Sequence, residues 1–296
     1  MDIRVLQYFL VVAQEESISR AAKILNMTQP PLSRQLHDLE EELGHQLFVR
    51  GARKITLTEE GLLLRHRAEE LVELLEKTKS EICSSNQAIR GDIYIGGGET
   101  DGMRLVAKAV RQLQKEHPNI HCHLFTGNSE DVADRLDRGL LDFGIMIAPT
   151  EKKKYDFIPL PVTDAWGLLM RKDSPLALRD GIRPKDLLGK PIIVPRQIIT
   201  NRELVGWIPK GARALNIVST YNLLFNAALL VEEGVGYALG IDKISVESIN
   251  DHLCFRLLTP QVQVGFDLVW KKDRFFSKAA ELFLESIRQQ SLENNG

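Results

Sequence analysis

The stretch TQPPLSRQLHDLEEELGHQLFVR, residues 28–50, decides how the first part of the chain folds. Its leucines recur at alternating steps of four and three residues, which is the spacing of one face of an α-helix. These are Leu32, Leu36, Leu39 and Leu43. Thr28 can cap the helix, and the two prolines after Gln29 fall in its first turn, where a missing N–H costs little. The sequence therefore predicts an amphipathic helix between Thr28 and Gly44, with its leucines facing inward.

Two shorter helices are predicted before this segment. Apolar residues at helical spacing indicate one helix over residues 4–14, and Ser17 can cap a second over residues 18–25. The side chains of Ala21 and Ala22 are small enough to let a neighbouring helix approach closely. The three helices together form a helix-turn-helix arrangement.

A basic hairpin is predicted after it. Residues 47–49 and 55–57 read as short strands, and residues 51–54 form the turn between them. This turn gives the domain a wing, so residues 1–58 are expected to form a winged helix-turn-helix.

The polar side of the helix that begins at Thr28 is suited to reading DNA. A helix that enters the major groove uses its N-terminal part against base edges, where Gln suits adenine and Arg suits guanine or phosphate. The predicted contacts are Thr28, Gln29, Pro30, Ser33, Arg34 and His37 on the helix, and Arg50, Arg53 and Lys54 on the wing. The alternative is a three-helix bundle that serves only structure or dimerisation.

A long helix follows, with Thr58 as its cap. Its apolar positions alternate in steps of four and three, which predicts a seam that packs against a partner helix. They are Leu64, Ala68, Leu71, Leu75, Thr78 and Ile82. The alternative is that this helix packs against its own domain. We expect residues 59–86 to form a linker and dimerisation helix, and residues 87–91 to form a hinge.

From Asp92 onward, strand and helix patterns alternate. The order is βαβαβ, then a second such unit, then a last strand and helix that return to the first. This predicts an α/β domain over residues 92–296, with lobe I at 92–162 and 266–296 and lobe II at 163–265.

In such open α/β sheets, ligands bind at the carboxyl ends of the strands. Pro195 and Tyr221 end two strands of lobe II. The candidate effector-binding residues are Gly98, Glu99, Thr100, Asp101, Asn128, Ile147, Arg196, Gln197 and Asn222. Glu99 and Asp101 can either face a ligand, with Arg196 as the counter-charge for an anion, or merely cap a helix.

The composition points to a soluble two-domain protein. The 296 residues are 44% hydrophobic and 26% charged, and the net charge of −2 does not announce nucleic-acid binding. The sequence carries no secretion signal, no membrane span, no paired cysteines and no nucleophile, phosphate-loop or zinc-protease motif, so we expect a cytoplasmic protein that is not an enzyme and needs no cofactor. His121 and His123 share a strand face, but two histidines alone do not indicate a metal site.

Four motifs resemble the N-terminal domain of LysR-type transcriptional regulators. They are LxxF at 6–9, SISRAAKIL at 17–25, the stretch at 28–50 quoted above, and ITLTEEG at 55–61. The segments GNSEDVADRLDRGLLDFGI at 127–145 and VEEGVGYAL at 231–239 are similar to the family's C-terminal domain, which is periplasmic-binding-protein-like (type 2).

The resemblance implies a sequence-specific regulator controlled by a small-molecule effector held between the lobes. It also implies a homodimer that assembles to a homotetramer, binds an interrupted inverted repeat in promoter double-stranded DNA, contacts RNA polymerase and is associated with the bacterial nucleoid. Thr100 matches the family's frequent hydroxyl, whereas Glu99 and Asp101 depart from its pattern, which argues against a small carboxylate effector. The segment Lys190–Asn216 lacks the cysteines of peroxide-sensing relatives. The alternative function is a small-solute receptor or enzyme of the binding-protein-like class, with an N-terminal module that serves assembly and not DNA binding.

Overall fold

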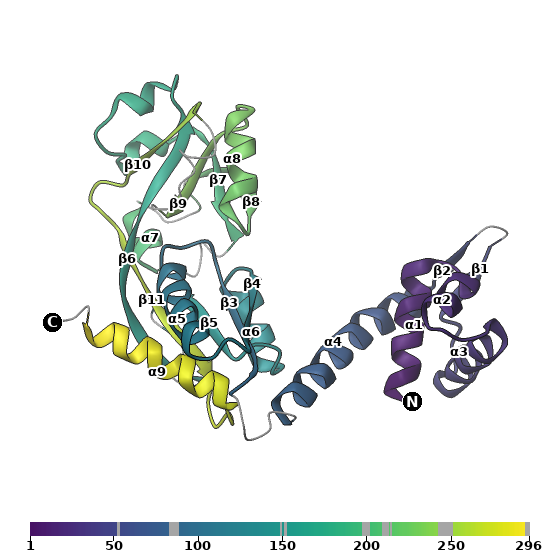
Figure 1. The fold of residues 1–296 in the computed structure, drawn as a ribbon. Coiled ribbons are helices and arrows are strands. Elements are labelled where there is room, and N and C mark those ends of the chain that lie inside the picture. The colour runs from purple at the N-terminus through teal and green to yellow at the C-terminus, as the bar shows by residue number, and fades with distance from the viewer. Residues whose placement is uncertain are drawn as a thin grey trace. The chain divides into compact units, whose positions relative to one another are not determined.

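The computed structural model describes residues 1–51, 54–82, 89–148, 150, 153–196, 202–208, 213, 215–241 and 251–293. The chain divides into two compact units, Met1–Cys83 and Ser84–Gly296. Figure 1 shows the elements of each unit.

The N-terminal unit is a winged helix-turn-helix, as predicted. Its elements are α1 (Ile3–Glu15), α2 (Ile18–Ile24), α3 (Gln29–Leu43), β1 (Phe48–Arg50), β2 (Ile55–Leu57) and α4 (Glu59–Ile82). The two strands pair antiparallel and form the wing. The core of the unit gathers apolar side chains from all four helices and from the start of the wing, namely Leu6, Phe9, Val12, Ala21, Ala22, Leu32, Leu36, Leu39, Leu47 and Ala68.

The helix α3 differs from the prediction at both of its ends. Thr28 lies at the N-cap position with extended backbone, but its side chain makes no capping hydrogen bond. Leu43 is 37% exposed and does not join the core. It is the last residue of the helix, directly before Gly44, whose φ of 72° turns the chain away. Leu32, Leu36 and Leu39 therefore anchor α3 without it.

The helix α4 packs against its own unit over its first half only. The Thr58 hydroxyl accepts from the Gly61 amide at 2.9 Å and so caps its first turn. Leu64 and Ala68 pack into the core of their own unit. Farther along, Leu71 and Ile82 are 42% and 78% exposed. The first half of the seam is thus used within the unit, and the second half stays open.

The C-terminal unit is an α/β domain built on one mixed sheet. Its elements are β3 (Gly91–Gly97), α5 (Met103–Glu116), β4 (Ile120–Thr126), α6 (Ser129–Asp137), β5 (Phe143–Ile147), β6 (Tyr155–Arg171), η1 (Pro175–Leu178), η2 (Pro184–Leu187), β7 (Pro191–Pro195), α7 (Arg202–Trp207), β8 (Asn216–Tyr221), α8 (Leu224–Glu232), β9 (Tyr237–Ile241), β10 (Leu253–Leu257), β11 (Gln263–Lys271) and α9 (Lys278–Glu293). The strand order is β4-β3-β5-β11-β6-β9-β7-β8, and β10 pairs with β6 off this path.

Two lobes follow from that order. The parallel strands β3, β4 and β5 form the first lobe, and the parallel strands β7, β8 and β9 form the second. The strand β11 returns to pair with β5, as predicted. Two strands, β6 and β10, were not predicted. The strands β6 and β11 form a long antiparallel ribbon that runs through both lobes, and its register shifts between Gly265 and Asp267.

Candidate functional site

The exposed side of α3 carries the polar residues that the sequence singled out. Gln29, Pro30, Arg34 and His37 are exposed and Ser33 is half-buried, while three leucines of the same helix, Leu32, Leu36 and Leu39, are buried. The leucines fix the helix to α1 and α2, so the polar side is held at the surface on a rigid support. This geometry suits insertion into a groove of a duplex.

These polar side chains differ in how they are held. The Ser19 hydroxyl of α2 donates to the amide oxygen of Gln29 at 3.0 Å, which fixes that side chain and leaves its NH₂ group to donate outward. His37 lies 3.4 Å from Glu41, one turn along the helix. Arg34 makes no hydrogen bond or ion pair with any described residue, so its guanidinium is available to a ligand.

The wing is held differently from the expectation. The Lys54 ammonium lies 3.2 Å from the Glu16 carboxylate, so part of its charge is already compensated within the protein. The side chain of Arg50 and the whole of Arg53 lie outside the described residues. Glu40, which the sequence showed only as part of an acidic run, accepts from the amides of Leu47 and Phe48 at 2.7 and 3.2 Å. It therefore ties the end of α3 to the start of the wing.

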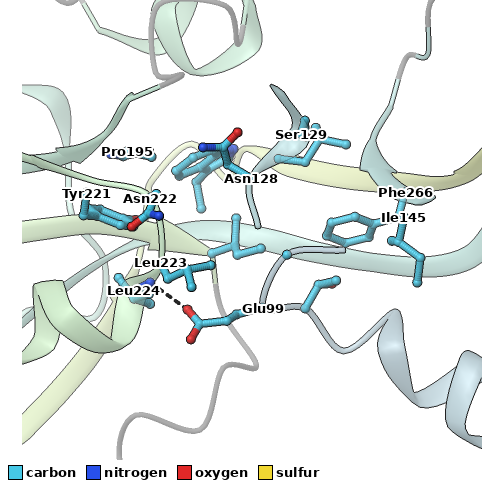
Figure 2. Close-up of a pocket in the computed structure, with 15 residues that line it drawn as sticks. Glu99, Asn128, Ser129, Ile145, Pro195, Tyr221, Asn222, Leu223, Leu224 and Phe266 are labelled. Carbon is cyan, nitrogen blue, oxygen red and sulfur yellow. Dashed lines mark hydrogen bonds between the residues drawn. The ribbon is translucent and has the colours of Figure 1, made fainter. Parts of the chain in front are cut away.

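A cavity of about 110 Å³ lies in the C-terminal unit, at the carboxyl ends of the strands (Figure 2). Six of the predicted effector-binding residues line it: Gly98, Glu99, Thr100, Asn128, Ile147 and Asn222. Asp101 and Arg196 do not line it, and Gln197 lies outside the described residues. Pro195 and Tyr221, at the ends of β7 and β8, also line the cavity.

Sequence reasoning missed much of the apolar wall. The unpredicted lining residues are Ser129, Ile145, Trp166, Leu223, Leu224, Ile241 and Phe266. Trp166 comes from β6, a strand that the sequence did not reveal, and Phe266 comes from β11 beside the shift in register. The signal that could have indicated some of these residues is the strand order, because residues at the carboxyl ends of adjacent strands lie close together.

Glu99 links the two lobes at this cavity. Its carboxylate accepts from the Leu224 amide at 2.7 Å, as Figure 2 shows. Leu224 opens α8, and the N-cap residue Leu223 offers no side-chain cap. The free amides of a helix N-terminus favour negative charge, so Glu99 of one lobe serves as the missing cap of a helix in the other. Burial raises the pKa of the Tyr221 phenol, and the nearby Glu99 carboxylate raises it further.

Asp101 has another role. Its carboxylate lies 2.8 Å from Arg104 in the first turn of α5, and this contact raises the pKa of the guanidinium. Glu99 therefore both caps a helix and faces the cavity. Asp101 does not line the cavity and pairs with Arg104 at the start of α5. Next to them, the Thr100 hydroxyl donates to the buried Asp164 at 3.0 Å.

The histidines of β4 lie beside an acidic residue of β3. His123 and His121 are 3.1 and 3.9 Å from the Asp92 carboxylate. Across the part of the chain that the structure describes, no three His, Cys, Asp or Glu side chains are arranged so that they could hold a metal ion. Within the same part, no helix is both long and apolar enough to cross a membrane.

Comparisons with known proteins cover both units. Residues 3–62 match the model of the bacterial regulatory helix-turn-helix protein, lysR family, and residues 86–292 match that of the LysR substrate binding domain. The chain is 27% identical over 292 residues to an uncharacterized HTH-type transcriptional regulator, YvbU, of Bacillus subtilis, covering 98% of each chain. It is 26% identical to the HTH-type transcriptional regulator BsdA of the same organism, covering 96% of this chain and 99% of that one.

Solved structures agree on the fold. Full-length CbnR complexed with its target DNA superposes with a TM-score of 0.72 at 20% identity, covering 98% of this chain and 99% of that one. Full-length BenM gives a TM-score of 0.53 at 24% identity, covering 100% and 98%. With family models matched over both units, the chain belongs to the LysR family: it is a DNA-binding transcriptional regulator whose C-terminal domain is an effector-binding domain.

Proposed function

We propose that this regulator reads a promoter through the polar side of α3 and that a small molecule in the cavity between the lobes controls it. The observation that carries the first half is that Arg34 is exposed and pairs with no described residue, on a helix held by the buried Leu32, Leu36 and Leu39. In this proposal Gln29, Ser33, Arg34 and His37 meet base edges, Thr28 and Pro30 lie at the groove wall, and Arg50, Arg53 and Lys54 reach phosphates from the wing.

The functional protein is proposed to be a homodimer that assembles to a homotetramer. Support comes from the second half of the α4 seam, where Leu71 and Ile82 are exposed. Pairing of this seam with a second copy would remove apolar surface from water and place two α3 helices together. The matching DNA is an interrupted inverted repeat whose half-sites are spaced by helical turns.

Each segment has a role in this proposal. Residues 1–58 bind DNA, residues 59–86 pair the copies and residues 87–91 act as the hinge. The effector domain, residues 92–296, comprises lobe I (92–162 and 266–296) and lobe II (163–265). We further propose that the protein works on the nucleoid in the bacterial cytoplasm, contacts RNA polymerase and catalyses no reaction. The regulators among its relatives support that assignment.

The DNA-binding half is tested by titrating the full-length protein against DNA from upstream of its own gene. We expect retardation that persists at near-physiological salt and a footprint with two halves related by symmetry. A footprint limited to a single half-site, or retardation equal to that of unrelated DNA, would reject it.

The effector half is tested by linkage. A metabolite screen for thermal stabilisation of the full-length protein identifies ligands, because binding to the folded state alone raises the melting temperature. A true effector must bind free and operator-bound protein with different affinities, since coupling between sites is reciprocal. A ligand with equal affinities for both forms is not an effector.

A further inference from the structure

The lining of the cavity between the lobes is apolar with one acidic side chain. Trp166, Ile241 and Phe266 are among its apolar residues. Among the described residues that line it, Glu99 is the only one with an ionisable carboxylate, and none is Lys, Arg or His. A ligand carboxylate would therefore meet no lining cation and would lie in the field of Glu99.

Two of the three hydroxyl groups on this lining, those of Thr100 and Tyr221, have committed their protons elsewhere. The Thr100 hydroxyl donates to Asp164 at 3.0 Å and accepts from the Gly102 amide at 3.1 Å. The Tyr221 hydroxyl donates to the carbonyl oxygen of Leu239 at 2.6 Å. Each hydroxyl has one proton, so toward the cavity these oxygens can only accept hydrogen bonds.

Glu99 is a third hydrogen-bond acceptor on this lining, and it carries the negative charge. One of its oxygens accepts from the Leu224 amide at 2.7 Å, and the carboxylate has further lone pairs for a second donor. Three oxygens that accept, one of them anionic, match a group that only donates and is positively charged. A protonated amine is such a group.

Trp166 closes the apolar side of this cavity. The residue is 4% exposed and lines the cavity, and its indole nitrogen is itself buried, so Trp166 presents its ring and no hydrogen-bond donor to a ligand.

We infer that the cavity takes an organic cation, a protonated amine on a compact apolar body, with Glu99 as its counter-charge; this rests on the proposed effector site. A cavity of about 110 Å³ has room for on the order of eight non-hydrogen atoms. Amine binding at Glu99 would add a ligand to the contact that joins the lobes, so occupancy bears directly on lobe closure.

The test compares three probes of nearly equal size on the full-length protein at pH 7 by isothermal titration calorimetry. Benzylamine is the cation, benzyl alcohol its neutral counterpart and benzoate the anion. We expect benzylamine to bind about ten-fold more tightly than benzyl alcohol, with benzoate weaker still, because a hydrogen bond to a charged group is stronger than a neutral one. Equal affinities, a preference for benzoate, or no saturable binding of benzylamine overturns the inference.

Two variants locate the charge. Glu99→Gln keeps an oxygen for the Leu224 amide and removes the charge, so it should bring benzylamine down to the affinity of benzyl alcohol. Asp101→Asn is the matched control, since Asp101 belongs to the same loop but pairs with Arg104 and does not line the cavity. Its cation preference should equal that of the unaltered protein. A preference that survives Glu99→Gln, or is lost in Asp101→Asn, overturns the inference.

Failure of the broader proposal has a different signature. Ile147→Trp fills the cavity and should weaken all three probes together, whatever their charge. If Ile147→Trp leaves their binding unchanged, the probes bind elsewhere, and both the effector site and the amine assignment fall. If Ile147→Trp weakens all three probes but the protein does not prefer benzylamine, the effector site stands and only the amine assignment falls.

Discussion

Removing the guanidinium of Arg34 should weaken operator binding without unfolding the protein. Arg34 is exposed on α3 and pairs with no described residue, so Arg34→Ala removes no contact with the described part of the protein, and alanine favours the helix. A bidentate contact to guanine contributes about 1–3 kcal/mol of discrimination per half-site, or roughly 5- to 150-fold in affinity. In a dimer on a symmetric site the contact is lost at both half-sites, and the loss doubles to about 2–6 kcal/mol because distant sites add.

The assay is fluorescence anisotropy of the full-length protein on duplexes with one half-site, two half-sites or unrelated sequence, at two salt concentrations. Arg20→Ala is the matched control, since Arg20 is also an exposed arginine of the helix-turn-helix but lies 3.3 Å from Glu15. We expect Arg34→Ala to reduce the preference for the operator and to leave the salt dependence unchanged.

Three results would refute this reasoning. Unchanged operator affinity would remove Arg34 from the interface. An equal loss on operator and unrelated DNA, with the salt slope reduced by about 0.9 per bound half-site, would assign Arg34 to a phosphate instead of a base. An equal loss in Arg20→Ala would show that the effect is not specific to the α3 surface.

Two further substitutions and one labelling experiment test the packing. Gly61→Ala should lower the thermal stability of the DNA-binding unit by about 1–3 kcal/mol, because the added Cβ would lie 2.2 Å from the carbonyl oxygen of Leu47; an unchanged melting curve contradicts this. Arg274→Met should lower the free energy of unfolding by about 3–5 kcal/mol, measured by denaturant titration, because it leaves the carboxylate of Asp142 without its counter-charge. The Asp142 side chain is 5% exposed and lies 2.7 Å from the Arg274 guanidinium. Burial, and then the charge of Asp142, raise the pKa of the Cys122 thiol from 9.0 to about 11. At pH 8, Cys122 should therefore carry roughly a hundred-fold less thiolate than a cysteine with a pKa of 9.0. Its reaction with iodoacetamide should be correspondingly slow until the pH rises toward 11. Peptide-resolved mass spectrometry measures that rate, and Cys122→Ala is the control for assigning the labelled peptide.

The elements with clear periodicity could be predicted from the sequence. The strand β5 (Phe143–Ile147) is a continuous apolar run, and α3 carries its leucines in strict helical spacing, so both were placed within a residue or two. The strand β6 was missed because Pro159 and Pro161 interrupt its apolar pattern, and proline argues against a strand. Both prolines lie in the part of β6 that pairs with β11 alone, where an absent amide is tolerated.

The candidate site could be predicted only where it depends on strand ends. Thr100, Asn128 and Asn222 follow β3, β4 and β8, so topology alone brings them to the cavity. Whether Glu99 or Asp101 would face it depends on side-chain direction within one loop, and a carboxylate that caps a helix more than a hundred residues away leaves no local pattern. Contacts of that kind follow from tertiary structure and not from spacing.

The ribbon of β6 and β11 limits how ligand binding in the cavity can change the rest of the protein. Paired strands resist being pulled apart but twist readily, and an irregularity in the ladder concentrates that twist. Around the register shift, residues 160–162 of one strand oppose the single residue Phe266 of the other. We therefore expect any ligand-driven motion of the lobes to be a torsion about this ribbon. Stiffening the ribbon at Gly265, away from any contact with the ligand, would change how strongly the protein responds to a ligand without changing which ligand it accepts.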